Sequence, residues 1–466
     1  MSLEAAVGDR AHRARRIRVT IPGEMHALAR IVGAAHLQRD AVVGDVAVAG
    51  VPATLVRPAS AGEVAAVVAW CYAHDIAIVP VGGRSGLAGG AAVLDADAVG
   101  VSLARLDSIR SFDPGLWRMH AEAGVATATI ARRARENGLL FPPDPGAPEQ
   151  SQLGGTIATN AGGPHAFKYG VTGDWVTGVE AVLAPGELVR VGGPVRKDVA
   201  GYDLRALLTG SEGTLGIITA AWLRLTPAPE AQLTVVAAYA DAAAGCAAIL
   251  RVLASGVVPA ALEFFDEGAI GVAGAAFPLG ALGGFVVVAE ADGSAAEAAR
   301  VRDELREALA PQAVALHCPD GAARAVWRWR DGVSLAVAAA RGAKLSEDLA
   351  VPVDRLEEAI AQTLRIGARH DLEACSWGHA GDGNVHASFL LDPGDAVQRA
   401  RADEAAQELF ELAWRLDGTV TGEHGIGVLK RGQLRRQWAP AAVAAQRAIK
   451  AALDPKGLLN PGKKLP

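Results

Sequence analysis

The chain has 466 residues, of which 51% are hydrophobic and 21% charged, and it contains 54 glycines. This length exceeds one ordinary core, so we expect two domains, and the composition excludes a disordered protein. The formal net charge of −6 excludes the overall basic surplus of a nucleic-acid binder. A local basic cluster, Arg10 to Arg18, is interpreted as a solvated terminal arm.

Cysteine usage and hydropathy indicate where the protein resides. The four cysteines are far apart and form no CxxC pair, which is typical of reduced thiols. The N-terminus shows no secretory signal pattern. Residues 268–289 carry no charge but contain six glycines and have acidic flanks, so we predict a loop that feeds a buried strand, and no transmembrane segment. The cytoplasm is the expected location, with the surface of the inner membrane as the alternative.

The first half begins with alternating strands and helices. Residues 51–58 predict a strand, residues 61–74 an amphipathic helix capped by Ser60, and residues 76–81 a buried strand. Short β-type runs separated by glycine turns follow from residue 124 to residue 226. Two prolines just after this stretch mark a predicted domain boundary.

The second half predicts a sheet covered by helices. Strands and Ala-rich helices alternate there, which favours a mixed sheet with helices on one face. The expected strands are 233–239 and 285–290, and the expected helices are 241–254, 294–309, 396–416 and 441–452.

A glycine-rich loop, PVGGRSGLAGG at residues 80–90, leaves the buried strand. Its glycines let backbone N–H groups converge on an anion, as in a dinucleotide pyrophosphate site, although a tight glycine turn is the alternative. No Gly-Lys-Ser/Thr follows and the spacing is not GxGxxG. Residues 154–163 and 210–219 add small and hydroxyl residues suited to a planar cofactor, which favours the cofactor site.

These three segments form part of a larger pattern. Together with AEAGV (121–125), PPDPG (142–146) and KDVAGYDL (197–204), they resemble the FAD-binding domain of the vanillyl-alcohol oxidase / p-cresol methylhydroxylase superfamily. The resemblance implies FAD and an α+β fold. It implies a two-part FAD-binding domain plus a cap domain with a mainly antiparallel sheet covered by helices. Some members of the superfamily attach the flavin covalently through His or Cys, but no residue here stands out as the attachment point, so we expect non-covalent FAD. The expected boundaries are 1–228 for the FAD-binding domain, 229–420 for the substrate or cap domain, and 421–466 for a segment that returns to the FAD-binding domain.

The resemblance also implies which residues contact FAD. The backbone of residues 82–86 would hold the pyrophosphate, Thr156, Asn160 and Gly163 would lie near the ribityl chain and flavin, and the segment around Glu212 would line the adenine side. The full predicted set is Pro80, Gly82, Gly83, Arg84, Ser85, Gly86, Pro143, Gly155, Thr156, Thr159, Asn160, Gly162, Gly163, Tyr169, Gly170, Glu212, Gly213, Gly216, Ile217, Ile218 and Asn460.

A second constellation suggests a metal. GHAGDGNVH (378–386) places His379 and His386 on either side of a Gly-Asp-Gly turn, so a hairpin could aim both imidazoles at one point. With Glu423 of GEHGIG they form a two-nitrogen, one-carboxylate set with open positions. A lone histidine is more often structural, but two glycine-flanked clusters favour a site.

These loops, with Arg330, KLSEDLAVP (344–352) and LNPGK (459–463), look like those of the D-2-hydroxy-acid dehydrogenase branch. That branch includes D-2-hydroxyglutarate dehydrogenase, D-lactate dehydrogenase and the glycolate oxidase D subunit. The resemblance implies a substrate of the D-2-hydroxyglutarate, D-lactate or D-malate type, or a glycolate oxidase FAD subunit as the alternative. The implied roles are Zn or Mn ligands for His379, His386 and Glu423, substrate contact for Asn384, and general base for His424.

The groups themselves suggest a mechanism. A divalent ion polarises the substrate hydroxyl, His424 accepts its proton, and hydride passes to flavin N5. Arg330 is the predicted anchor for the substrate carboxylate, with Lys344 second. Ser334 stands where the hydroxyglutarate enzymes have threonine. The alternating WRWRD around Arg330 also fits a solvated helix or strand face.

Two interpretations from other classes stay open at this point. A metal-dependent hydrolase would use the same ligands to activate water, but it leaves the cofactor motifs unexplained. A non-catalytic flavoprotein, or a relative of the alkyl-transfer enzymes of the superfamily, would not need the predicted base and cations. For the dehydrogenase, electron-transfer flavoprotein or a quinone is the expected electron acceptor, and a homodimer is a further expectation.

Overall fold

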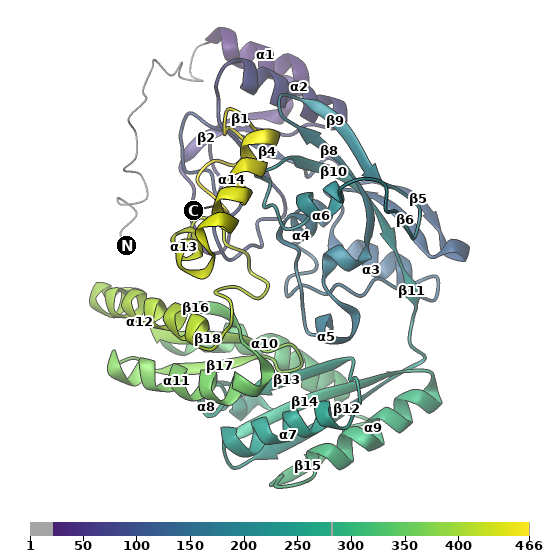
Figure 1. Cartoon of the computed structure of the whole chain (residues 1–466), viewed down its shortest axis with the longest axis vertical. Coiled ribbons are helices and arrows are strands. Elements are labelled where there is room, and N and C mark those ends of the chain that lie inside the picture. Colours follow the sequence, from purple (N-terminus) through teal and green to yellow (C-terminus); the bar gives the residue numbers. More distant parts are fainter. Residues whose placement is uncertain (1–21, 281–282, 466) are drawn as a thin grey trace. The chain divides into compact units, whose positions relative to one another are not determined.

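The computed structural model describes residues 22–280 and 283–465, with side chains from residue 26 onward. These residues form two compact units (Figure 1). Unit 1 comprises the chain up to Ala161, Val171–Pro227 and the chain from Glu423, whereas unit 2 comprises Gly162–Gly170 and Ala228–Gly422. The predicted boundaries lie at residues 228 and 420, and the corresponding limits of the units lie at Pro227 and Gly422. The basic cluster from Arg10 to Arg18 lies outside the described residues.

Unit 1 holds two main sheets. Its strands are β1 (Leu37–Val42), β2 (Pro52–Val56), β3 (Ile78–Val81), β4 (Val99–Ser102), β5 (Ile109–Asp113), β6 (Arg118–Glu122), β7 (Leu139–Leu140), β8 (Val176–Leu183), β9 (Glu187–Gly192), β10 (Ile217–Arg224) and β11 (Thr226–Pro227). Its helices are α1 (Pro22–Val32), α2 (Ala61–Ala73), α3 (Thr127–Arg135), α4 (Leu153–Thr159), α6 (Leu204–Leu208), α13 (Leu434–Gln437) and α14 (Pro440–Leu453).

The two sheets of unit 1 differ in strand direction. The four-stranded sheet has the order β1-β2-β4-β3, with parallel β2, β4 and β3 and an antiparallel edge strand β1. The five-stranded sheet has the order β5-β6-β10-β8-β9 and is antiparallel throughout. The expected division of the first domain into two parts is therefore confirmed.

Helix α2 joins the two sheets through one core. Ser60 caps the helix by accepting a hydrogen bond from the Glu63 N–H, as predicted. The apolar face of α2 packs with strand residues of both sheets, including Ile78 and Ile217. Leu459 from the C-terminal tail completes the same core, and its segment bridges to β3 at Ile78. The tail is thus part of the framework from which the glycine-rich loop leaves.

Unit 2 is built on one seven-stranded sheet. Its strands are β12 (Ala231–Tyr239), β13 (Ala261–Phe265), β14 (Phe285–Gly293), β15 (Ala315–His317), β16 (Ala343–Ala350), β17 (Ala374–His379) and β18 (Asn384–Leu391). Its helices are α5 (Ala166–Tyr169), α7 (Ala242–Ala254), α8 (Glu267–Ala273), α9 (Ala295–Leu309), α10 (Ala323–Arg341), α11 (Leu356–Arg369) and α12 (Ala396–Arg415). The strand order is β15-β12-β14-β13-β17-β18-β16, and every neighbouring pair is antiparallel.

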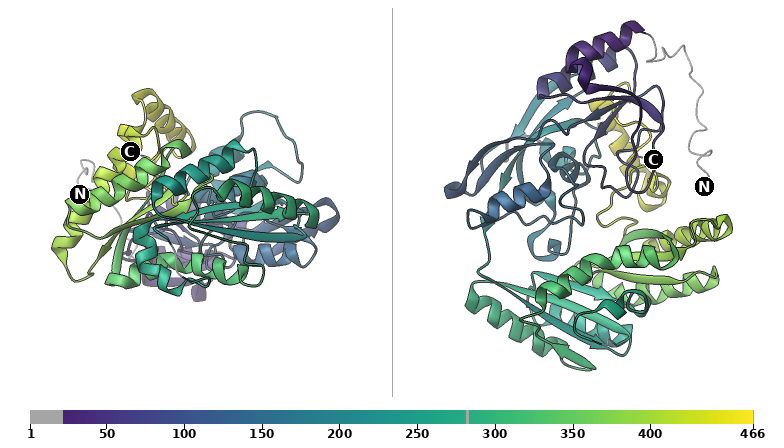
Figure 2. Two further views of the ribbon diagram at one scale, coloured as in Figure 1. Left: turned by 90° about the horizontal axis from the view of Figure 1, so that it is seen from below. Right: turned by 180° about the vertical axis from the view of Figure 1, so that it is seen from behind.

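Helices cover both faces of this sheet (Figure 2). Helices α8 and α10 share a core with Phe265 and Trp377 on one face. Helix α7 lies on the opposite face, where Gly245 lies against the Phe285 ring, and α9, α11 and α12 also contact the sheet. The expectation of a mixed sheet with helices on one face is therefore wrong. The strands are all antiparallel, and because both faces of the sheet carry apolar residues, helices cover both faces.

Two further expectations about chain segments are corrected by the structure. Residues 162–170 belong to unit 2, although the predicted first domain ran through them without interruption. The uncharged stretch 268–289 is not a simple loop, because most of α8 lies within it and Asp266 caps that helix. Among the described residues, no helix is both long and apolar enough to cross a membrane.

Gly245 offers a test of the fit between α7 and the sheet. A Cβ atom at this position would lie 2.0 Å from the Phe285 ring, whose side chain is fully buried. We expect Gly245→Ala to lower the free energy of unfolding by about 1–3 kcal/mol through overpacking. Chemical denaturation would measure the loss.

A matched control is Gly271→Ala in α8, where a Cβ would meet no atom within 4 Å. Its stability should equal that of the parent protein or exceed it by up to about 1 kcal/mol, because alanine restricts the unfolded chain. Equal losses in the two variants would contradict the described contact between Gly245 and Phe285.

Candidate active site

The register of unit 2 places the predicted metal and substrate residues on one face of its sheet. Strands β17 and β18 form a hairpin in which Trp377 lies opposite His386, and His379 lies opposite Asn384. On the neighbouring strands, Glu263 pairs with His379. Because directly opposite residues share a face, these side chains form one polar row. The predicted hairpin around the Gly-Asp-Gly turn is confirmed.

His379 is held by a buried carboxylate. Its Nδ1 lies 2.7 Å from Glu263 Oε1, and Glu263 is 0% exposed. Arg330 donates to the other oxygen, with Nε at 2.8 Å and Nη2 at 2.6 Å from Glu263 Oε2. Burial alone would raise the pKa of Glu263, but the charges and hydrogen bonds of Arg330 and His379 lower it. The Glu263 carboxylate is therefore charged, and it orients the imidazole.

The two histidines of the hairpin lie next to each other. Their ring centroids are 5.4 Å apart, and the rings are nearly perpendicular at 86°. His386 also lies 5.9 Å from the Trp377 ring. Both histidines are buried. With Nδ1 of His379 directed at Glu263, Nε2 is the nitrogen that faces away from the carboxylate, which is the arrangement of a metal-ligating histidine with an acidic partner.

Asp348 connects Thr421 and Gly422, the last residues of unit 2, to this row. It pairs with His386 in the β16–β18 register, and its Oδ1 accepts from Asn384 Nδ2 at 2.6 Å. Its Oδ2 accepts from Thr421 Oγ1 at 2.8 Å and from the Gly422 N–H at 3.0 Å. The next two residues in the chain are Glu423 and His424. The GEHG motif therefore begins with Gly422, a residue whose backbone N–H binds Asp348.

The predicted cations lie on α10 and β16. Arg330 and Ser334 are one helical turn apart, and the Ser334 hydroxyl accepts from Lys344 Nζ at 2.7 Å. The ammonium group also lies 4.5 Å from the centroid of the Trp377 ring. Burial lowers the pKa of Lys344 to about 8. The structure thus brings Ser334 and Lys344 together beside the polar row, and WRWRD forms a helix with Arg330 on its inner face.

Residues 162–170 contribute a second buried polar group that the sequence did not indicate. Tyr169 Oη donates to Asp292 Oδ2 at 2.5 Å, and Lys168 pairs with the same carboxylate. His165 Nε2 lies 3.1 Å from Glu290 Oε1, two residues earlier on β14. The predicted cofactor residues Gly162, Gly163, Tyr169 and Gly170 therefore belong to a segment that is anchored to unit 2.

The glycine-rich loop of unit 1 borders a cavity of about 310 Å³. Gly82, Gly83 and Arg84 line it together with Gln150 and Gln152. A Cβ on Gly83 would lie 1.9 Å from the Gln150 carbonyl oxygen, so only glycine fits there. The buried Oε1 of Gln152 has no hydrogen-bond partner among the described residues. A glycine-lined cavity with an unused polar atom fits a phosphate-bearing cofactor such as FAD.

Helix α4 carries other predicted FAD contacts. A Cβ on Gly155 would meet no atom within 4 Å, so this backbone is open to a ligand. The hydroxyls of Thr156 and Thr159 donate to backbone oxygens of their own helix. Asn160 ends the helix in the left-handed region with φ +54°. The part of α4 that is open to a ligand is therefore the backbone at Gly155, and not the threonine hydroxyls.

The remaining predicted cofactor residues of unit 1 have close structural contacts. A Cβ on Gly213 would lie 2.9 Å from Pro80, and one on Gly216 would lie 2.8 Å from Leu183. The side chain of Glu212 accepts from the backbone N–H groups of Ile426 and Gly427. The side-chain nitrogen of Asn460 donates to the carbonyl oxygens of Gly90 and Glu212. Of the others, Ile217 and Ile218 begin β10, Pro143 is buried, and Ser85 and Gly86 lie in the glycine-rich loop.

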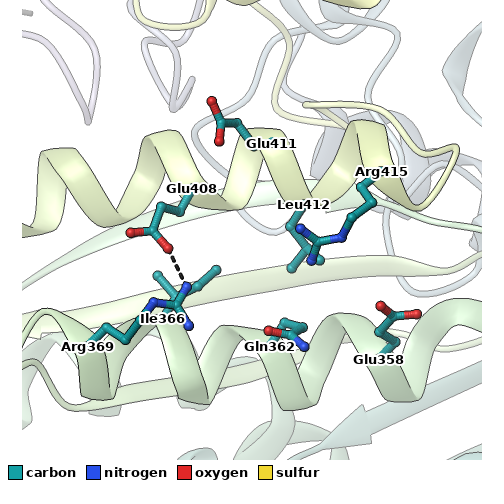
Figure 3. Close-up of a pocket in the computed structure, with 8 residues that line it drawn as sticks. All are labelled: Glu358, Gln362, Ile366, Arg369, Glu408, Glu411, Leu412 and Arg415. Carbon is teal, nitrogen blue, oxygen red and sulfur yellow. Dashed lines mark hydrogen bonds and ion pairs between the residues drawn. The ribbon is translucent and has the colours of Figure 1, made fainter.

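Another pocket lies in unit 2 between α11 and α12 (Figure 3). It has a volume of about 670 Å³ and contains none of the predicted site residues. Charged side chains such as Glu358 and Arg415 line it, and Arg369 pairs with Glu408 across it. The predicted metal and substrate residues therefore lie outside this pocket.

Sequence reasoning missed Glu263, Asp348 and Trp377 as members of the site. A signal existed for Glu263, because an acidic residue within the apolar run ALEFF is costly to bury without a partner. Asp348 lies inside the KLSEDLAVP motif, but nothing in the sequence indicated that its partners would be Asn384 and Gly422.

Comparisons with known proteins place the chain in a family. Residues 228–464 match the family described as "FAD linked oxidases, C-terminal domain", and residues 52–192 match "FAD binding domain". The first match spans just over half of the chain. The chain belongs to the FAD-linked oxidases. It is an oxidoreductase that binds FAD.

Relatives of this FAD-linked oxidase cover nearly its whole length. Glycolate oxidase subunit GlcD of Bacillus subtilis is 34% identical over 420 residues, covering 88% of each chain. D-2-hydroxyglutarate dehydrogenase of Xanthomonas citri pv. viticola is 35% identical, covering 88% of this chain and 89% of the relative. D-lactate dehydrogenase of Anaerostipes hadrus is 33% identical with the same coverage. The predicted D-2-hydroxy-acid dehydrogenase branch is confirmed.

Solved structures of the superfamily share the fold. p-Cresol methylhydroxylase with substrate bound has a TM-score of 0.79 at 16% identity, covering 94% of this chain and 96% of that one. Alkyldihydroxyacetonephosphate synthase has a TM-score of 0.73 at 16% identity, covering 96% and 86%. These likenesses establish the fold of the FAD-linked oxidase. They do not identify its substrate, which has to be inferred from the site residues.

The Glu263–Arg330 pair of this FAD-linked oxidase predicts a large stability effect. Arg330→Met keeps most of the aliphatic stem but removes the charge that compensates the fully buried Glu263. We expect the free energy of unfolding to fall by about 3–5 kcal/mol. Chemical denaturation of the purified flavoprotein would measure this.

The matched control is Arg328→Met on the same helix, because the Arg328 side chain is exposed. A surface change of this kind should alter stability by no more than about 0.5 kcal/mol. If Arg330→Met and Arg328→Met cost the same, Glu263 does not depend on Arg330 for its compensation.

Proposed function

We propose that the protein oxidises a D-2-hydroxy acid to the 2-oxo acid, with hydride transfer to flavin N5. The observation that carries this proposal is the polar row of unit 2, where His379, His386 and Asn384 share a sheet face with the cation Lys344. Such a face offers metal ligands and an anion anchor in one place. The relatives described above are named for glycolate, D-2-hydroxyglutarate and D-lactate, which supports the same reaction class.

We propose that His379, His386 and Glu423 hold a divalent metal ion, Zn or Mn. The donor set of two imidazoles and one carboxylate suits these ions and leaves positions for a substrate. Glu263 supports the proposal because it accepts a hydrogen bond from Nδ1–H of His379 and so directs Nε2 toward a ligand. A histidine that served only to satisfy hydrogen bonds would not need its tautomer fixed by a charged, fully buried group.

The chain's own residues then divide the work of the reaction. When bound, FAD supplies a hydride acceptor and the metal ion supplies a Lewis acid. His424 accepts the hydroxyl proton of the substrate, because a neutral imidazole nitrogen can act as a general base. Asn384 is held by Asp348 through its amide nitrogen, and its buried Oδ1, which has no partner among the described residues, faces the site for a substrate donor.

The two predicted anchors for the substrate carboxylate are not equivalent. The Arg330 guanidinium already makes two contacts with Glu263. Lys344, in contrast, makes no ion pair with a carboxylate among the described residues, although it is positioned by Ser334 and Trp377. A partly buried cation without a counter-charge favours an anionic ligand. We therefore propose Lys344 as the principal carboxylate anchor, with Ser334 beside it and Arg330 in support.

A panel of substrates distinguishes a D-2-hydroxy-acid dehydrogenase from a glycolate oxidase subunit. We expect a yellow protein whose flavin is bleached anaerobically by a D-2-hydroxy acid and much more slowly by the L enantiomer. D-2-hydroxyglutarate, D-lactate, D-malate and glycolate form the panel. Preferential reduction by glycolate would favour the second candidate, a glycolate oxidase FAD subunit, which the name of the Bacillus relative supports.

The same assay tests the metal. After dialysis against a chelator, the protein should retain its flavin absorbance but lose reduction by the substrate, and added Zn or Mn should restore it. Unchanged reduction in metal-free protein would refute the metal assignment alone. Absence of bleaching by every D-2-hydroxy acid would refute the dehydrogenase assignment and favour a non-catalytic flavoprotein.

Substrate binding should depend on the charge of Lys344. Its pKa is lowered to about 8, so the ammonium form is present below this pH and is lost as the pH rises through it. We expect the KM for a D-2-hydroxy acid to rise about tenfold per pH unit above about 8, because the neutral amine no longer attracts the carboxylate. Steady-state kinetics between pH 6 and about pH 10 would show the break.

Two variants sharpen this pH test. Lys344→Arg keeps a charge up to about pH 12, so the break near pH 8 should vanish even if KM is higher overall. Lys168→Arg is the matched control, because Lys168 already pairs with Asp292, and the break should persist. A break that persists in Lys344→Arg would assign the titration to another group.

The assignment of an electron acceptor rests on the family resemblance alone. We propose electron-transfer flavoprotein or a quinone as the acceptor, a cytoplasmic location that allows contact with the inner-membrane surface, and a homodimer. Reoxidation of the reduced flavin by each acceptor in turn, together with the molecular mass in solution, would test these assignments.

A further inference from the structure

We infer that Glu212 is a positioning residue that sets the location of His424 relative to the flavin-binding helix α4. This inference deepens the proposed function and rests on it, because it assumes that His424 is the base. All residues that carry it belong to unit 1, and the sequence motif GSEGT had suggested only an adenine contact for Glu212.

The first observation is the pair of hydrogen bonds at the Glu212 carboxylate. Its Oε1 accepts from the Ile426 N–H at 2.8 Å, and its Oε2 accepts from the Gly427 N–H at 2.7 Å. Two consecutive backbone N–H groups thus bind the two oxygens of one carboxylate. Because Glu212 is only 6% exposed, water does not compete for these bonds. His424 lies two residues before the first donor.

The second observation is the lack of space around the loop. A Cβ on Gly425 would lie 3.0 Å from Glu212 Oε1, and a Cβ on Gly427 would lie 1.8 Å from the Ala88 carbonyl oxygen. Both glycines have positive φ, +83° and +49°. The Val428 N–H donates to the same Ala88 oxygen at 2.9 Å. These contacts therefore fix the backbone conformation of residues 425–428 against the Glu212 carboxylate and against Ala88 of the glycine-rich loop.

The third observation is that the backbone of Glu212 is tied to α4. Its N–H donates to the Ala158 carbonyl at 2.7 Å, and its carbonyl accepts from Asn460 Nδ2 at 2.7 Å. Glu212 itself has φ +53°, a strained conformation for a residue with a side chain. One residue thus connects the helix that carries Gly155, the open backbone position, to the loop that carries His424.

These three observations separate two roles for Glu212. A cofactor contact would direct the carboxylate at the ligand, but here both oxygens are used by the 426–427 backbone. Misplacement of a catalytic group by about 1 Å costs about a hundredfold in rate. Loss of the carboxylate should therefore slow flavin reduction, while FAD binding should be retained because both carboxylate oxygens already bind backbone N–H groups.

The test compares Glu212→Gln with Lys464→Gln in the FAD-loaded, full-length protein. Glutamine keeps the shape of Glu212, but its NH2 group cannot accept the second N–H. The Lys464 ammonium lies 3.3 Å from Glu212 Oε1, so Lys464→Gln removes a charge next to the carboxylate and leaves both N–H bonds in place. The measured quantity is the rate constant of anaerobic flavin reduction by the best D-2-hydroxy acid of the panel.

We expect Glu212→Gln to lower this rate constant by about tenfold to a hundredfold, with less than about a twofold change in the substrate concentration for half-maximal rate. Lys464→Gln should stay within about twofold of the parent. Reduction by dithionite, which needs no base, should be equally fast in all three proteins. His424→Ala serves as the reference for complete loss of the base.

Two results would overturn the inference. One is a Glu212→Gln rate within about twofold of the parent. The other is loss of FAD from Glu212→Gln, which would make Glu212 a cofactor residue. If this variant does not fold, amide hydrogen exchange of Ile426 and Gly427 in the parent decides, since strong protection is expected and rapid exchange contradicts the clamp. A parent protein that no D-2-hydroxy acid reduces refutes the proposed function, while the exchange result still tests the clamp.

Discussion

The polar row of unit 2 depends on one charge that has no access to water. The Glu263 carboxylate is fully buried, and it stays ionised only because Arg330 and His379 share it. It costs several kcal/mol to bury such an ion, and the hydrogen bonds to both oxygens offset that cost. The same bonds orient the His379 imidazole and keep α10 against the sheet. The stability of unit 2 and the proposed metal site therefore depend on the same three side chains.

Sheet register extends this arrangement across four strands. Because β13, β17, β18 and β16 are antiparallel neighbours, residues far apart in sequence lie directly opposite each other and share a face. A shift by one residue in any strand would turn its polar side chains to the opposite, apolar face. The row from Glu263 to Asp348 is thus specified by the same alternation that buries Trp377 and Phe265. The sequence of the β17–β18 hairpin therefore determines both which polar side chains form the row and which apolar side chains are buried.

Local signals in the sequence predicted much of the fold. The cap at Ser60, the strand that precedes the glycine-rich loop and the hairpin between His379 and His386 depend on neighbouring residues, so the sequence was sufficient for them. The partner of Glu263 and the anchoring of residues 162–170 depend on contacts between residues more than 60 positions apart, which no short pattern encodes. The same reason explains Glu212, since its partners Ile426 and Gly427 lie more than 200 residues later.

The division of the chain has a consequence for how the molecule is made. The chain passes between the units after Ala161, Gly170, Pro227 and Gly422, so neither unit is a continuous piece. Leu459 is completely buried in the core of unit 1, next to residues synthesised near the beginning. During translation, nascent domains usually fold in order from the N-terminus. The core of unit 1 is therefore not complete until Leu459 has been synthesised, whereas the main segment of unit 2, Ala228–Gly422, precedes Leu459 in the chain.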